Sequence, residues 1–176
     1  HNKENFAFFM EMGTGKSKVL IDNIAMLHDK GKINSALIVA PKGVYRNWER
    51  QEIPTHMPEH VDYSVLVWNP NSTSFLKEYA KFLKNDDKLK IFLINIDAFS
   101  TVKGTEIAKR FLVATQCMMA IDESTTVKTP TAKRTKTICK MRTLAKYRRI
   151  LTGSPVTKSP LDLYTQCYFL DPELLG

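Results

Sequence analysis

Long apolar runs are missing from this sequence. The longest apolar stretches, such as residues 6–10 and 37–40, are far shorter than the roughly 20 residues that a helix needs to cross a bilayer. We therefore expect no membrane association. Glycine and proline are also scarce, with 7 and 8 of 176 residues, which excludes collagen-like and low-complexity chains. With 43% hydrophobic and 25% charged residues, the chain has the composition of a packed globular protein.

Cysteine is equally sparse. Cys117, Cys139 and Cys167 are widely separated and form no CxxC pair, which argues against both a zinc cluster and a disulfide framework. We therefore expect a reducing, intracellular compartment. Within it, the cytoplasm of a bacterium or of a viral host is favoured over a nucleus. The chain starts at His1 rather than Met, so the absence of a signal peptide says little about the native start.

Acidic residues are absent from residues 124–161. The chain has a formal net charge of +8, and this stretch concentrates the excess because it holds ten basic residues. A concentrated basic patch suits a polyanion such as nucleic acid. The alternative is a solvated helix face that meets acidic neighbours from other segments. The ten basic residues are Lys128, Lys133, Arg134, Lys136, Lys140, Arg142, Lys146, Arg148, Arg149 and Lys158.

Short apolar runs alternate with longer amphipathic stretches, which is the pattern of βαβ units on a parallel sheet. Strands are predicted at residues 6–10, 36–40, 64–68, 91–95, 118–121 and 149–151. Helices are predicted between them at residues 16–29, 44–52, 74–83, 105–114, 131–142 and 161–169. We therefore expect an α/β fold with a doubly wound, mostly parallel sheet flanked by helices, in a single domain over residues 1–176.

A phosphate-binding pattern lies between the first predicted strand and the first predicted helix. Gly13, Thr14, Gly15, Lys16 and Ser17 match the end of GxxxxGK[ST], although Met10 replaces the first glycine. Small residues let backbone amides approach phosphate oxygens, and the following helix directs its positive end at them. Lys16 is then expected to neutralise the β- and γ-phosphates and Ser17 to bind Mg²⁺.

A second pattern is an apolar strand that ends in two carboxylates. Residues 118–121 are followed directly by Asp122 and Glu123. At the carboxyl edge of a parallel sheet, Asp122 would face the same crevice as the phosphate loop. This placement suits Asp122 for the Mg²⁺ shell and Glu123 for orienting or deprotonating the attacking water. The alternative is an Asp-Glu pair that only caps the next loop.

In order along the chain, these and further motifs resemble the first RecA-like lobe of superfamily-two helicases and translocases, most closely the Swi/Snf-like branch. The resemblance covers about residues 6–176. Each motif is weak alone, whereas the set in this order is highly specific. The matching segments are residues 11–17 for motif I, 37–42 with 47–52 for motif Ia, 93–97 for motif Ib, 121–123 with 128–133 for motif II, 151–156 for motif III, and 169–176 for the end of the lobe.

Motif III separates the branches of this superfamily. The RNA-directed DEAD-box helicases carry Ser-Ala-Thr there, whereas residues 151–155, Leu-Thr-Gly-Ser-Pro, are similar to the Swi/Snf-like form. Members of that branch usually translocate on double-stranded DNA. Thr152, Gly153 and Ser154 are implied to link the nucleotide state to the other lobe and to nucleic acid. Ser124 and Thr125 depart from the branch, which usually has Ala or Gly and then His at these positions.

The resemblance implies an ATP-binding motor lobe with ATP and Mg²⁺ as its ligands. Glu123, Asp122 and Lys16 are the implied catalytic residues, and a second RecA-like lobe, absent from this chain, would supply an arginine finger. The isolated lobe is therefore expected to be nearly inactive as an ATPase. Two alternatives stay open: a nucleic-acid-binding module without motor activity, and a P-loop kinase.

Nucleic-acid contacts are predicted at two places. Lys42 and Asn47 follow a strand whose carboxyl end borders the nucleic-acid track of the similar family, so they are candidates for phosphate contacts. Lys133, Lys136 and Lys140 lie in one predicted helix at a spacing that puts them near one face. That face is either part of the track or a docking surface. Trp48 could stack on a base, but a core position is favoured.

Overall fold

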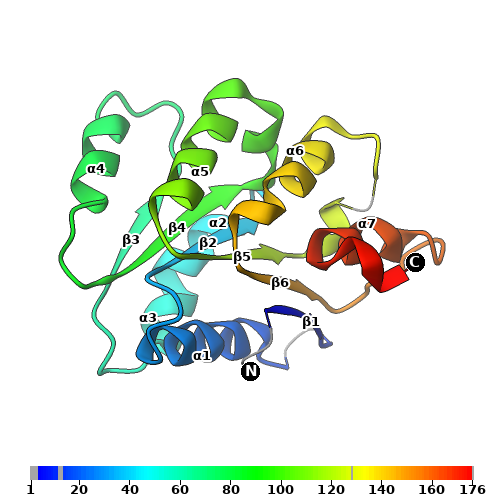
Figure 1. The fold of residues 1–176 in the computed structure, drawn as a ribbon, viewed down its shortest axis with the longest axis horizontal. Coiled ribbons are helices and arrows are strands. Elements are labelled where there is room, and N and C mark those ends of the chain that lie inside the picture. The colour runs from blue at the N-terminus through cyan, green and yellow to red at the C-terminus, as the bar shows by residue number, and fades with distance from the viewer. Residues whose placement is uncertain (1–3, 12–13, 128, 176) are drawn as a thin grey trace.

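The computed structural model describes residues 4–11, 14–127 and 129–175. Six parallel strands form one twisted sheet in the order β1-β6-β5-β2-β4-β3 (Figure 1). The predicted α/β fold with a parallel sheet is confirmed, and each predicted strand is present with its ends shifted by a few residues. The strands are β1 (Asn5–Phe9), β2 (Ser35–Ala40), β3 (Tyr63–Val67), β4 (Leu89–Asn95), β5 (Cys117–Asp122) and β6 (Tyr147–Thr152).

Helices cover both faces of the sheet. Right-handed crossovers put α1, α2 and α3 on one face, where the chain moves from β1 towards β3, and α4, α5 and α6 on the other, where it returns (Figure 1). In the described residues no helix has the length and apolar character to cross a membrane. The helices are α1 (Lys16–Asp29), α2 (Tyr45–Asn47), α3 (Ile53–His56), α4 (Phe75–Phe82), α5 (Val102–Ala114), α6 (Lys133–Met141) and α7 (Asp162–Leu170).

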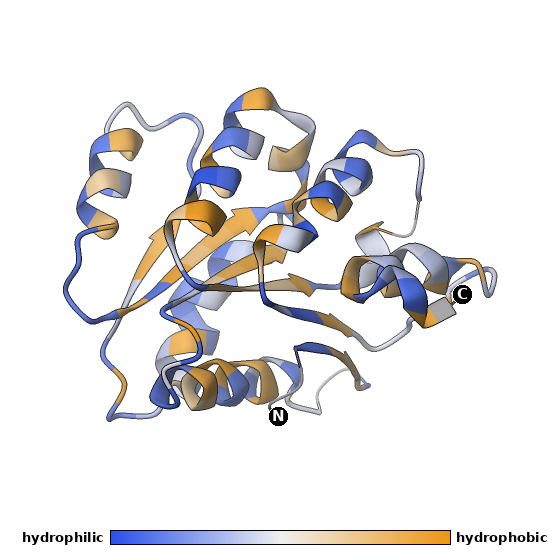
Figure 2. Cartoon of the chain, viewed as in Figure 1, coloured by the Kyte–Doolittle hydropathy of each residue, from blue (hydrophilic) through white to orange (hydrophobic). Residues whose placement is uncertain are grey.

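The central strands are buried along their whole length and mainly apolar. Every residue of β2, β4 and β5 is buried, because helices cover both faces of a parallel sheet. Figure 2 shows the same strands as mainly hydrophobic, with the polar residues on the outer sides of the helices. Aromatic rings extend this core between α4, α5 and β4, where Phe92 and Phe111 lie edge to face with centroids 5.4 Å apart.

The helix predicted at residues 44–52 is interrupted. The chain forms α2, then a π-helical stretch over Trp48–Glu52, then α3. Pro54 lies at the start of α3 and has no backbone N–H, and its ring would clash with the carbonyl four residues earlier in a regular helix. The wider π-helical turn accommodates this clash.

The acid-free stretch does not form one basic surface. Arg149 is fully buried, and its guanidinium donates to Asn23 Oδ1 at 2.8 Å and to the carbonyl of Glu4 at 2.7 Å. Burial lowers the pKa of Arg149 to about 10. Arg148 donates to the carbonyl of Leu170 at 2.8 Å. The charge pattern therefore overstated the patch, because these two arginines hold β6 in the fold.

Candidate nucleotide site

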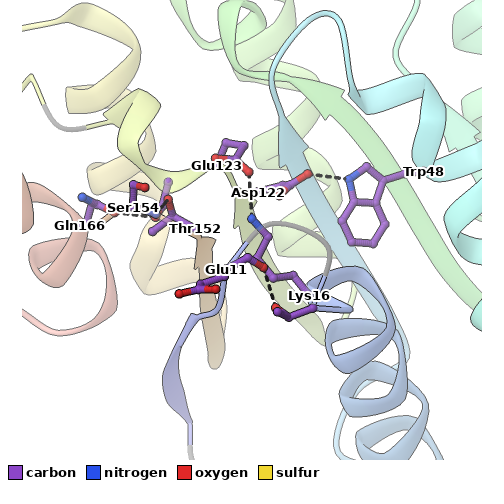
Figure 3. Close-up of polar contacts among 10 residues, drawn as sticks. Glu11, Lys16, Trp48, Asp122, Glu123, Thr152, Ser154 and Gln166 are labelled. Atoms are coloured by element: carbon purple, nitrogen blue, oxygen red, sulfur yellow. Dashed lines mark hydrogen bonds and ion pairs between the residues drawn. The ribbon is translucent and has the colours of Figure 1, made fainter. Parts of the chain in front are cut away.

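Three neighbouring strands, β1, β6 and β5, end at the same edge of the sheet. Phe9 pairs with Thr152, and Leu151 pairs with Asp122. The N–H of Met10 donates to the carbonyl of Thr152 at 3.2 Å, which extends the β1–β6 pairing by one residue. Motif III therefore lies between the phosphate loop and motif II at this edge (Figure 3).

The loop between β1 and α1 leaves the helix N-terminus open. Gly15 precedes α1 with φ of 84°, a left-handed conformation that favours glycine. No side chain caps α1, and its first turn holds no acidic residue, so its first N–H groups and positive dipole end can receive an anion. The hydroxyl of Thr14 is used within the loop, because it donates to the carbonyl of Glu11 at 2.6 Å. Gly13 lies outside the described residues.

Lys16 reaches from α1 to the end of motif II. Its Nζ donates to Glu123 Oε1 at 3.1 Å, and its side chain is 12% exposed against 40% for that of Glu123. Ser17 follows and is half-buried. The fold therefore brings together residues of motifs I and II that are 107 positions apart in the sequence.

Asp122 is the last residue of β5 and is buried. Burial raises the pKa of its carboxyl group, and a hydrogen bond from Trp48 acts against that rise. Trp48 Nε1 donates to Asp122 Oδ2 at 2.9 Å, and the indole is 1% exposed. Trp48 is thus a core residue rather than a base-stacking one.

The bond from Trp48 to Asp122 was missed by the sequence analysis. A signal existed, because a buried indole N–H needs an acceptor. A carboxylate at the end of a neighbouring buried strand was a candidate acceptor, since β2 and β5 are paired and Trp48 lies in the segment that follows β2.

Glu123 has a strained backbone. Its φ is 51°, in the left-handed region, where a residue with a Cβ costs roughly 1–2 kcal/mol. Its carbonyl accepts from the N–H of Thr126 at 3.0 Å, which closes a turn directly after β5. Strain of this kind is concentrated at functional sites, where the surrounding structure holds it.

Motif III continues from the buried end of β6. Thr152 is 1% exposed, and its hydroxyl oxygen accepts from the N–H of Ser154 at 3.2 Å. Gly153 is half-buried and Ser154 is exposed. Thr152 therefore lies at the same edge as Lys16 and Asp122, and the two residues after it are progressively more exposed to solvent.

The predicted nucleic-acid contacts lie on separate elements. Lys42 is exposed on the loop after β2, and Asn47 donates to Glu52 Oε1 at 3.3 Å. Lys133, Lys136 and Lys140 are exposed on α6. Lys136 and Lys140 line a groove of about 500 Å³ between α6 and α7, together with Tyr164 and Tyr168. All five predicted contacts are accessible. Lys42 and Asn47 follow the carboxyl end of β2, which is paired with β5, whereas the three lysines lie on α6.

Comparisons with known proteins identify the family of this chain. The profile of one protein family, described as the SNF2-related domain, matches residues 1–176. The CHD3-type chromatin-remodeling factor CHR7 of Arabidopsis thaliana is 26% identical over 183 residues, covering 99% of this chain and 14% of that protein. Helicase SWR1 of Cryptococcus neoformans is 28% identical over 179 residues, covering 99% of this chain and 13% of that protein.

Among solved structures, the Sulfolobus solfataricus SWI2/SNF2 ATPase core in complex with double-stranded DNA matches with a TM-score of 0.72 and 23% identity, covering 98% of this chain and 32% of that chain. This match shows the fold and agrees with the predicted RecA-like lobe. The predicted resemblance to the Swi/Snf-like branch is confirmed by the family match. The chain spans about one seventh of the length of the two curated relatives.

The expected localisation is wrong. A cytoplasmic protein of bacterial or viral origin was favoured, but the curated relatives come from a plant and a fungus, and one of them is named as a chromatin-remodelling factor. The preference rested on sparse cysteine, and this indicates only a reducing compartment. It does not distinguish cytoplasm from nucleus.

Proposed function

Because this chain belongs to the SNF2-related domain family, we propose that it is the ATP- and Mg²⁺-binding lobe of a DNA-dependent ATPase motor. The observation that carries the proposal is the meeting of the open N-terminus of α1 with the end of β5, where Lys16 contacts Glu123 at 3.1 Å. ATP hydrolysis requires a phosphate group, a metal ion and the attacking water to be held close together. The carboxyl edge of a parallel sheet is where such ligands bind.

The positive groups of motif I are suited to the ATP phosphates. The N–H groups at the start of α1, after Gly15, are free of side-chain caps and can donate to phosphate oxygens. Lys16 lies at the same place and would exchange its bond to Glu123 for a phosphate oxygen. ATP binding would therefore release the Glu123 carboxylate for its own role.

The oxygen ligands here fit Mg²⁺. In the described residues no cluster of three or more His, Cys, Asp or Glu side chains could hold a metal alone. Magnesium does not require one, since it is usually bound through one or two carboxylates, waters and substrate phosphates. Asp122 and the hydroxyl of Ser17 would hold the ion, which neutralises charge on the phosphates when bound.

Glu123 is the proposed base. Its side chain is more exposed than that of Lys16, and its left-handed backbone turns it out of the β5 direction. Once free of Lys16, its carboxylate can orient a water and accept its proton. Trp48 acts on Asp122, the residue before Glu123, because the indole N–H fixes one oxygen of the Asp122 carboxylate.

The proposed partners are supported by the family and the fold match. Double-stranded DNA is the proposed nucleic acid, supported by the duplex in the matched Sulfolobus core. A second RecA-like lobe of the same protein would complete the site with an arginine. Because an arginine finger contributes about 10³–10⁵ in rate, the isolated lobe should be nearly inert.

The test is ATP hydrolysis by the full-length protein with Mg²⁺, measured with and without duplex DNA, single-stranded DNA and RNA. We expect duplex DNA to stimulate hydrolysis most strongly. A protein that binds duplex DNA but hydrolyses no ATP would be a binding module without motor activity. Phosphoryl transfer to a small acceptor, at a rate indifferent to nucleic acid, would indicate a P-loop kinase.

A further inference from the structure

A buried polar pair joins the residue after Glu123 to α7. Ser124 begins the 3₁₀ turn that follows β5, and its Oγ donates to Gln166 Oε1 at 2.5 Å. Both residues are fully buried. Their positions are 42 residues apart in the sequence, so the pair is a tertiary contact between motif II and the helix that follows motif III.

The amide of Gln166 uses its remaining groups on the same side of the molecule. Its Nε2 donates to the carbonyl of Pro155 at 2.9 Å and to the carbonyl of Asp162, one turn earlier in α7, at 2.8 Å. Two carbonyl acceptors fix which end of the amide is the NH₂ group, since a flipped amide would set oxygen against oxygen. The orientation of Gln166 is therefore determined by its partners.

Pro155 connects this pair to motif III, because it directly follows Ser154. The rest of that loop is held by the start of α7. Asp162 Oδ2 accepts from the backbone N–H groups of Thr157 at 2.9 Å and Lys158 at 2.8 Å. The loop that leaves Thr152 is thus tied to α7 at two points, once by Asp162 and once by Gln166.

The other end of the pair adjoins the strained residue. Glu123 holds φ of 51°, and Ser124 is the next residue along the chain. A left-handed residue keeps its conformation only when its neighbours are held, and the buried bond to Gln166 holds Ser124. A displacement of the motif III loop at Pro155 would therefore act on Glu123 through two hydrogen bonds.

We propose that Gln166 is a positioning residue that couples the motif III loop to Glu123 through Ser124. This rests on the proposed function, since coupling has a meaning only if nucleic acid controls ATP hydrolysis. Among the described residues, the hydrogen bonds of Gln166 go to Ser124, Pro155 and Asp162, and none goes to Ser17 or Asp122, the proposed metal ligands. It acts by fixing the relative positions of two segments that contribute to the site.

The test uses the full-length protein with the variants Ser124→Ala, Gln166→Leu and the double variant. The readout is the ratio of DNA-stimulated to basal ATPase rate, with thermal stability measured alongside. We expect each variant to lower this ratio about tenfold, within the usual range of coupling between sites. In the double variant the ratio should be no lower than in the single variant with the lower ratio, because the two substitutions break the same connection.

Stability should behave differently from coupling. Removing one partner leaves a buried polar group unsatisfied, whereas removing both is less costly than the sum. The double variant should therefore lose less stability than the two single variants together, yet keep the low ratio. A ratio that recovers along with stability would show that the pair only holds the fold, and would overturn the proposal.

Ser35→Ala is the matched control. Ser35 is also fully buried, and its hydroxyl donates to Thr115 Oγ1 at 2.7 Å, at the opposite edge of the sheet. The same atom and the same kind of bond are lost, and the ratio should stay at the wild-type value. If Gln166→Leu does not fold, Ser124→Ala carries the test alone, since it removes a single hydroxyl.

The outcomes separate the two proposals. Wild-type protein without DNA-stimulated hydrolysis would contradict the proposed function itself. Wild-type protein with such stimulation, and variants that retain the wild-type ratio, would contradict only the role of Gln166. A parallel fall of basal and stimulated rates would also contradict it, because the site would then be damaged rather than uncoupled.

Discussion

The two edges of the sheet bury similar polar groups and use them differently. At the amino edge, the hydroxyl of Ser35 donates to that of Thr115, which donates in turn to the carbonyl of Phe111 at 2.7 Å. The first bond joins the start of β2 in the sheet to the residue after α5, and the second lies at the end of α5. At the carboxyl edge, the bonds of Lys16 and Trp48 converge on the two neighbouring carboxylates of motif II.

The carboxyl edge also departs from ordinary local structure at several points, although Asp87, just before β4 at the amino edge, has a left-handed backbone as well. Glu123 has a left-handed backbone, burial raises the pKa of Asp122, and α1 begins without a side-chain cap. Proteins break local rules mainly where function requires it. The comparison indicates that polar residues at the amino edge serve stability and that those at the carboxyl edge serve nucleotide chemistry.

The largest expected effect is that of Glu123→Gln. The amide keeps the shape of the side chain and loses the base, so turnover in the full-length protein should fall by about 10²–10⁴ while ATP binding is retained. Steady-state hydrolysis with duplex DNA measures it. Glu106→Gln is the control, because Glu106 lies exposed on α5. Retention of most of the rate would remove Glu123 from the catalytic role.

Trp48→Phe should have a smaller effect on the same site. The ring stays in the core, but Asp122 loses its N–H donor, and loss of such a supporting bond typically costs about 10–100-fold in metal affinity. The Mg²⁺ concentration for half-maximal hydrolysis should therefore rise. Trp68→Phe is the control, since Trp68 is buried just after the distant edge strand β3. An equal Mg²⁺ requirement in both variants would contradict the role given to Trp48.

The lysines of α6 test whether the exposed face of this helix binds nucleic acid. Each phosphate contact contributes a salt slope of roughly 0.7 to 0.9. Replacing Lys133, Lys136 and Lys140 together should therefore flatten the dependence of log affinity on log salt by about two to three units. Filter binding or fluorescence anisotropy over a salt series measures the slope.

The outcome separates the two hypotheses for this surface. An unchanged slope, with reduced stability or assembly of the full-length protein, would indicate that α6 docks a protein segment. Lys77, Lys81 and Lys84, which are exposed on or just after α4 at the other end of the sheet, form the control set. Their replacement should leave the slope unchanged if binding is confined to α6.

The smallest effect is expected at the amino edge. Ser35→Ala removes one buried hydrogen bond, whose net contribution is about 1 kcal/mol. The free energy of unfolding should fall by about that amount, and ATP hydrolysis should not change. Chemical denaturation and steady-state kinetics measure the two quantities. A clear loss of activity would break the distinction between the two edges.

Much of the fold was predictable because strands and helices follow local periodicity. The apolar runs predicted all six strands, and the glycine before Lys16 with the amphipathic stretch after it predicted α1 at its observed bounds. The proximity of Lys16 and Glu123 also follows, because parallel strands end at one edge. These inferences need only the order of motifs and the topology.

Other features depend on contacts that no local pattern records. The bond of Ser124 to Gln166 joins residues whose neighbours in sequence give no sign of the partner. For Trp48 the sequence indicates that an acceptor is needed, and only the fold selects Asp122 among the candidates. Arg149 has the charge of a surface residue, and only the packing of β6 against α1 shows that it is buried. Such pairs are set by tertiary packing.

The central claim is that the start of α1 and the end of β5 form a nucleotide site, and calorimetric titration with Mg·ATP tests it most directly. Lys16→Ala should lower the affinity for ATP by roughly 10–150-fold, the equivalent of a lost hydrogen bond to a charged group, with the fold intact. Lys18 lies two residues after Lys16 on α1, is exposed and pairs with Asp22. The variant Lys18→Ala should bind ATP like the wild type. Equal ATP affinity in Lys16→Ala and wild type would contradict the claim.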